Sequence, residues 1–74
     1  MMPMQYLVIV EKSENGFGAY VPDLPGCIAA GATRDEVIAL IQEAIEFHID
    51  GLKRVGDPVP MPRSQSELVD VHAA

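Results

Sequence analysis

The chain has no tryptophan, a single cysteine and only five basic residues among its 74. One cysteine excludes a disulfide within the chain. Because eleven acidic residues bring the formal net charge to −6, the chain lacks the cationic surface that binds nucleic-acid phosphates. We expect no direct nucleic-acid binding, and we expect this charge to attract a basic protein.

Long hydrophobic runs are also missing. The first apolar stretch ends at Glu11 and Lys12, too soon for a membrane-spanning helix, and no basic residues precede it as they would in a secretory signal. We therefore expect a cytoplasmic protein without membrane contacts.

Apolar residues are abundant, at 49% of the chain. A chain of this length buries only about 60% of the surface that its unfolded form exposes, so much of this apolar surface cannot be hidden within one copy. We expect a single domain, residues 1–74, that forms a homodimer or tetramer.

A β-hairpin is predicted near the N-terminus. Residues 4–12 are rich in β-branched and aromatic side chains, and residues 17–21 form a second such run. Between them stands Asn15-Gly16, a dipeptide that favours the two positive φ angles of a tight hairpin turn. This turn would place Lys12 opposite Ala19.

The same pairing predicts two distinct faces of the hairpin. One face is expected to meet the core, and it carries Tyr6, Val8, Val10, Phe17, Ala19 and Val21. The other face carries Gln5, Leu7, Ile9, Glu11 and Tyr20.

A helix is predicted after a short third strand at residues 27–30. Thr33 and Glu36 form a capping box, and Gly56 lies just past the expected helix end at about Arg54. The apolar stripe of this helix comprises Val37, Leu40, Ile41, Ala44, Ile45, Ile49 and Leu52. The acidic residues fall on the opposite side of the helix.

The prolines at positions 58, 60 and 62 predict an extended linker, after which residues 68–71 could form a fourth strand. The expected fold is α+β in the order β-β-β-α-β, with a four-stranded mixed sheet in the order 3-2-1-4 and one helix on one face. Because one helix covers only one face of such a sheet, we predict that Leu7, Ile9 and Tyr20 form an interface on the other face.

Residues 22–27 form the densest turn signal of the chain, with two prolines, a glycine and the cysteine. The six residues are Pro22, Asp23, Leu24, Pro25, Gly26 and Cys27. Each proline fixes φ and withholds a backbone N–H, and glycine can take the positive φ of a sharp reversal. We interpret this segment, the proline corner, as a rigid structural motif.

Over about residues 4–62 the chain resembles the HicB-like antitoxin family. The resemblance is carried by Tyr6, residues 16–21, the proline corner, Gly31, Thr33, Glu36 and residues 43–45. It implies a partial ribonuclease-H-like fold and a small, basic HicA-like toxin partner that cleaves mRNA and is neutralised by occlusion. Many relatives carry a C-terminal DNA-binding domain, which we expect this short form to lack.

A second hypothesis is a stand-alone homo-oligomeric module that is regulatory or binds a ligand, without a toxin partner. Neighbouring genes would separate the two, since an adjacent frame for a small basic protein supports an antitoxin.

Residues capable of catalysis are few, and we assign no catalytic, cofactor or metal site. His48 has no second ligand at metal-binding spacing, and Cys27 has no evident orienting partner for a nucleophile. Gly16 and Gly18 lack the rest of a nucleotide loop. Glu11 and Asp70 are too few carboxylates for a two-metal nuclease. The expected class is a non-enzymatic, protein-binding module.

Overall fold

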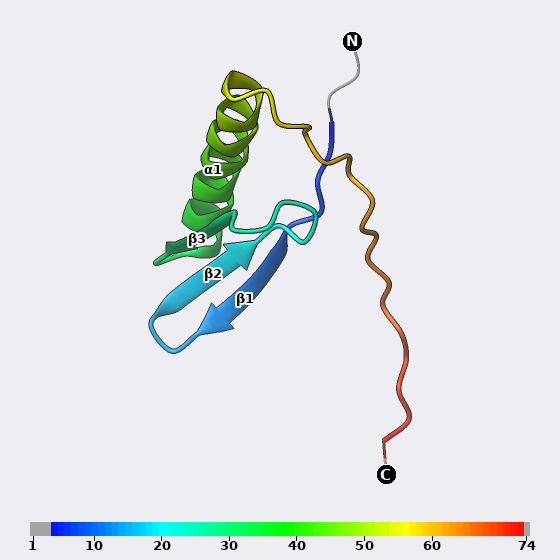
Figure 1. Cartoon of the computed structure of the whole chain (residues 1–74). Helices are drawn as coiled ribbons and strands as arrows, with labels where there is room; N and C mark the ends of the chain where they lie inside the picture. Colours follow the sequence, from blue (N-terminus) through cyan, green and yellow to red (C-terminus); the bar gives the residue numbers. More distant parts are fainter. Residues whose placement is uncertain (1–3, 74) are drawn as a thin grey trace.

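The computed structural model describes residues 4–73, which form a three-stranded antiparallel sheet and one helix (Figure 1). The strands are β1 (Ile9–Ser13), β2 (Gly16–Tyr20) and β3 (Ile28–Gly31), in the spatial order β1-β2-β3. Helix α1 (Arg34–Arg54) follows β3 and packs mainly on β2 and β3. The fold is α+β, as the sequence predicts.

The hairpin forms with a register two residues away from the predicted one. Lys12 pairs with Phe17, not with Ala19, and the loop consists of Glu14 and Asn15. Gly16 belongs to β2 and has a φ of +151°, while no other residue type takes a positive φ in the described part of the chain. Gly16 is therefore a residue of the sheet and not a residue of the hairpin loop.

A close backbone approach explains why glycine stands at this position. A Cβ atom on Gly16 would overlap the carbonyl oxygen of Gly31 on β3. The loop is closed instead by Ser13, whose hydroxyl donates a 3.1 Å hydrogen bond to the carbonyl of Gly16. Because a shift of two residues preserves the alternation of side chains, the predicted faces of the hairpin are unchanged.

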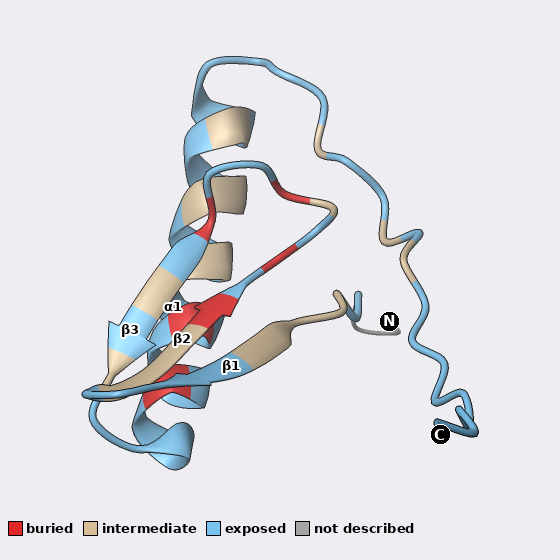
Figure 2. Ribbon diagram, turned by 90° about the horizontal axis from the view of Figure 1, so that it is seen from below, coloured by how far each residue is buried: buried red, intermediate tan, exposed pale blue. Residues whose placement is uncertain are grey.

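The core lies between α1, the end of β2 and the proline corner (Figure 2). Its buried residues are Ala19, Val21, Leu24, Cys27, Val37 and Ile41. Tyr6, Val8, Val10 and Phe17 pack against it, so the predicted core face of the hairpin is confirmed.

The helix begins and ends where the sequence predicts. The amide of Glu36 donates to the Thr33 hydroxyl at 3.1 Å, which satisfies one of the free N–H groups of the first turn. At the other end Gly56 takes a φ of +76°, which ends the helix beyond Val55. Leu40, expected in the buried stripe, is instead exposed.

The predicted fourth strand at residues 68–71 does not form within the described chain, and the sheet keeps only the order 3-2-1. Residues 57–73 form no helix or strand, and the part beyond Ser64 runs away from the body of the molecule (Figure 1). Leu68 is 99% exposed. The physical reason is that Pro58, Pro60 and Pro62 hold the linker extended, and a strand needs a neighbouring strand to satisfy its backbone.

Candidate protein-binding surface

The proline corner ties the end of β2 to the start of β3. The amide of Leu24 donates to the Val21 carbonyl at 3.1 Å, and the amide of Cys27 donates to the Leu24 carbonyl at 3.1 Å. Leu24 is fully buried, and Gly26 takes the positive φ, +84°, that the reversal needs. The corner therefore reverses the chain and contributes a core residue.

The Cys27 side chain faces the core from this corner. Burial raises the pKa of the Cys27 thiol, which keeps the thiol protonated near neutral pH. The thiolate is the nucleophilic form of cysteine. Cys27 thus acts as a small buried hydrophobic residue.

Asp23 fastens the linker to the proline corner. Its carboxylate accepts hydrogen bonds from the amides of Arg63 and Ser64, at 2.8 and 2.9 Å, and from the Ser64 hydroxyl at 2.8 Å. These bonds, the Ser64 amide first, hold the pKa of Asp23 below its usual value. The sequence offers no signal for this contact, because its partners lie 40 and 41 residues apart.

Tyr6 makes a second attachment to the linker. Its hydroxyl donates a 2.5 Å hydrogen bond to the carbonyl of Pro60. Desolvation, followed by the nearby charge of Asp23, raises the pKa of the Tyr6 hydroxyl. Together Tyr6 and Asp23 hold residues 60–64 against the body. The described residues beyond Ser64 are exposed to solvent.

The sheet face opposite α1 presents a row of apolar side chains across all three strands. Ile9 pairs with Tyr20, and Tyr20 pairs with Ile28, so the three side chains project from the same face. Tyr20 is 41% exposed and Ile28 is 71% exposed, whereas Ile9 is half-buried. We call Ile9, Tyr20 and Ile28 the open-face row.

The structure thus places two of the three predicted interface residues, Ile9 and Tyr20, in one row. Leu7 lies before β1 and is half-buried. Ile28 was missing from the prediction, although it alternates with Cys27 and Ala29, which face the core side. That alternation could have placed Ile28 on the uncovered face, whereas its position beside Tyr20 follows only from the pairing of β3 with β2.

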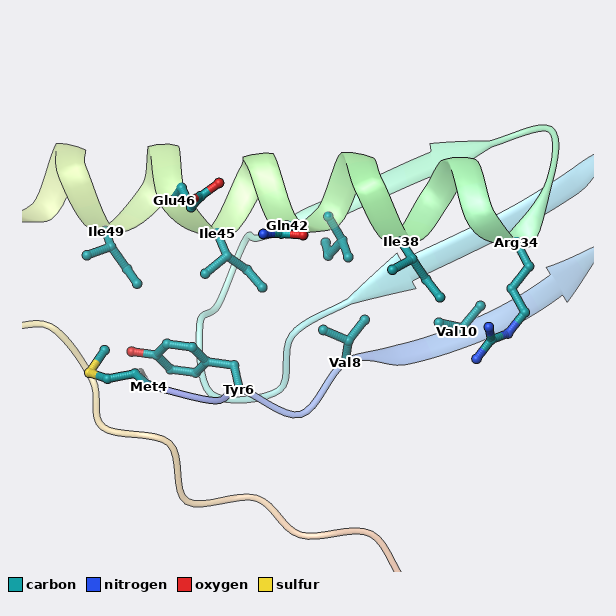
Figure 3. Close-up of a pocket in the computed structure, with 11 residues that line it drawn as sticks. Met4, Tyr6, Val8, Val10, Arg34, Ile38, Gln42, Ile45, Glu46 and Ile49 are labelled. Atoms are coloured by element: carbon teal, nitrogen blue, oxygen red, sulfur yellow. The ribbon is translucent and has the colours of Figure 1, made fainter. Parts of the chain in front are cut away.

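A groove of about 560 Å³ separates β1 from α1 on the core side of the sheet (Figure 3). Tyr6, Val8 and Val10 line one wall. Ile38, Ile45 and Ile49 of α1 project toward them from the other wall. The sequence predicts Ile45 and Ile49 in a packed stripe. The groove remains because α1 packs mainly on β2 and β3 and lies less closely against β1.

The outer face of α1 carries a third exposed feature. Phe47 is 82% exposed, beside the acidic side chains of Glu43 and Asp50. Asp50 forms an ion pair with Arg54 at 2.9 Å, one helical turn away and open to solvent. Such an exposed pair contributes little to stability.

The residues considered for catalysis come from separate parts of the fold, with Glu11 in β1, Cys27 just before β3 and His48 in α1. Within residues 4–73, no group of three or more His, Cys, Asp or Glu side chains is placed to hold a metal ion. His48 is half-buried on α1. The described chain also contains no helix of sufficient length and apolarity to cross a bilayer.

Comparison with protein families matches residues 6–73 to the HicB-like antitoxin of bacterial toxin-antitoxin systems. A UPF0150 protein of Thermoplasma acidophilum is 41% identical over 71 residues, covering 95% of this chain and all of that protein. Antitoxin HicB 2 of Photorhabdus laumondii is 32% identical over 72 residues, which are 96% of this chain. The matched region spans only 52% of that antitoxin.

Among solved structures, one chain of a HicA3 and HicB3 toxin-antitoxin complex superposes with a TM-score of 0.70. It is 35% identical in sequence, and the match covers 81% of this chain and 70% of that chain. The profile match over residues 6–73, the sequence relatives and this structural likeness agree. The chain belongs to the HicB-like antitoxin family.

Proposed function

We propose that this protein neutralises a small, basic, HicA-like mRNA-cleaving toxin by covering its active surface. The observation that carries the proposal is the likeness to a chain of a toxin-antitoxin complex, at 35% identity over most of this chain. The net charge of −6 supports a basic partner. The site of action would be the cytoplasm, where a toxin of this kind meets mRNA.

The open-face row is the surface on which the toxin would dock. The row of Ile9, Tyr20 and Ile28 offers an aromatic anchor flanked by aliphatic side chains, and tyrosine is among the residue types that contribute most binding energy at protein interfaces. Glu11, the next residue of β1 on this face, adds a negative charge. Occlusion needs affinity and not chemistry, so the protein acts without being an enzyme.

The fold supports the same assignment. We propose that the three antiparallel strands and the helix on one face represent part of a ribonuclease-H-like fold, as the family resemblance implies. This likeness concerns the fold only and implies no nuclease activity, because a fold does not establish catalytic activity.

A second candidate function is a stand-alone homo-oligomeric module that is regulatory or binds a ligand. The groove between β1 and α1 favours it, because that groove is mostly apolar and large enough for a ligand or for part of another chain. This function would require no toxin.

Co-expression with the adjacent reading frame tests the first candidate. If the neighbouring gene encodes a basic protein that arrests growth, this chain should restore growth and co-purify with it. Tyr20→Asp should abolish both effects, because it places a charge in the open-face row. Phe47→Asp is the matched control on the outer face of α1 and should retain both effects.

Two results would count against this function. Absence of rescue and of a complex with wild-type protein would favour the stand-alone module. Rescue that survives Tyr20→Asp and fails with Phe47→Asp would move the docking surface to α1.

A further inference from the structure

The outer edge of β1 has no neighbouring strand within residues 4–73, since β1 pairs only with β2. An edge strand presents unpaired N–H and C=O groups, which readily pair with another extended segment. The groove lies along the start of β1 and the residues that precede it, because Val10 of β1 and Val8 just before it line one of its walls. The edge and the groove together form a seat for one more strand with an apolar face.

The chain also contains an extended segment without a place to pack. Val69 and Val71 are 73% and 81% exposed and share one side of this segment, while Leu68 and Asp70 share the other. Two valines flanking an aspartate are typical of a strand with one buried face.

The attachments of the linker direct this segment away from its own sheet. Asp23 fixes Arg63 and Ser64, and the hydrogen bond from Tyr6 fixes Pro60. Beyond these anchors the segment departs from β1 in both views (Figures 1 and 2). The molecule is consequently elongated, 51 Å in its longest dimension against 27 and 23 Å in the others.

We propose that residues 66–72 of one copy add as a strand to the β1 edge of a second copy, and that the second copy returns the same segment. Val69 and Val71 would enter the partner's groove opposite Val8 and Val10. Leu68 would then join the partner's open-face row. Such reciprocal exchange gives a closed two-fold dimer in which both free β1 edges are covered.

A second copy fits this seat better than an unrelated protein. The exposed valines and the empty groove belong to the same sequence, so each copy supplies both halves of the contact. A chain of 74 residues also has too small a core to stand easily alone. The inference concerns self-assembly and does not depend on toxin binding.

Molar mass in solution provides the first test. Light scattering at micromolar concentration should give the wild-type chain twice its mass of 8.0 kDa. The double variant Val69→Asp and Val71→Asp should give a monomer, whereas Asp70→Asn, on the other side of the segment, should remain a dimer. A monomeric wild-type chain, or a double variant that stays dimeric, overturns the proposal.

Cross-linking separates exchange from the return of the strand to its own sheet. Val10→Cys and Val71→Cys in one chain, treated with a short bis-maleimide, should link two chains into a dimer band on a denaturing gel. The native Cys27 is buried and out of reach. Replacing Val71→Cys by Asp70→Cys, which points away from the groove, should lower the yield several-fold.

A link confined to a single chain, running at the monomer position, contradicts exchange and places residues 66–72 on their own β1. Equal yields from the two cysteine positions contradict a seated strand. Neither outcome bears on the toxin assay, so assembly and neutralisation can fail separately.

Discussion

Asp23 is the residue on which the path of the C-terminal segment depends. Its carboxylate accepts three hydrogen bonds from Arg63 and Ser64, whereas the other attachment of the linker, from Tyr6 to Pro60, is a single bond. An ionised carboxylate accepts stronger hydrogen bonds than a neutral one. The attachment is therefore tied to the charge of a single side chain.

Asp23→Ala should release the linker and increase amide exchange at Arg63 and Ser64, as measured by NMR. The pKa of Asp23 is lower in the folded state. The stabilisation is therefore fully present above the unfolded value, about 3.9, and is lost as the pH falls through the lower folded value. Asp57→Ala is the control, since no hydrogen bond of its side chain is present in residues 4–73. Unchanged exchange in Asp23→Ala would contradict the attachment.

Gly16 and Gly18 are two glycines on β2 with opposite tolerance. Gly16→Ala should destabilise the fold by more than about 1 kcal/mol, because its φ of +151° disfavours a side chain and its Cβ would overlap Gly31. Gly18→Ala should be near neutral, since the nearest atom to its Cβ is 3.9 Å away. Urea midpoints measure both changes, and equal midpoints would refute the assigned role of Gly16.

At the scale of the element, α1 contains a glycine at a position where a larger side chain would fit. Gly51 stands in the helix with open space around the position of a Cβ atom. Gly51→Ala should therefore raise the free energy of unfolding by about 0.5–1 kcal/mol, because alanine loses less conformational entropy in a helix. Gly56→Ala, at a φ of +76°, should lower it. Thermal unfolding by circular dichroism distinguishes the two, and a loss of stability in Gly51→Ala would contradict this assignment.

Elements specified by neighbouring residues were predictable, and those specified by distant contacts were not. The helix follows from Thr33, Glu36 and Gly56, all of which act within one turn of its ends. The hairpin register was wrong because Gly16 is constrained by Gly31, fifteen positions later, and not by its own turn. Sequence alone carries no trace of that approach.

The candidate site was predictable only in part. Alternation along one hairpin placed Ile9 and Tyr20 on the uncovered face. The pairing of β3 with β2 was needed to add Ile28. The groove was not foreseen, because a packed fourth strand was expected where the structure has a free β1 edge.

At the scale of the whole molecule, the proposed toxin complex would draw on both charge and apolar surface. A net charge of −6 acts over a distance of about 8–10 Å at physiological ionic strength and would attract a basic toxin before contact. The open-face row would contribute only after contact, when water is expelled. The two contributions should consequently appear in different rate constants.

Surface plasmon resonance with the purified toxin measures this division. Raising the salt concentration should slow association and change dissociation little. Tyr20→Ala should speed dissociation by roughly 30-fold, corresponding to a loss of about 2 kcal/mol, and leave the salt dependence intact. If Tyr20→Ala acted only on association, the row would not be the contact surface.

The long exposed segment after Ser64 is a site at which proteases can cleave the chain. Proteases cut segments that can be drawn into an extended conformation, and residues 65–73 are already extended and outside the sheet. A segment paired with a neighbouring strand is protected from such cleavage. If residues 66–72 exchange as proposed, the survival time of this segment in a protease digest would therefore report the fraction of the protein that is assembled.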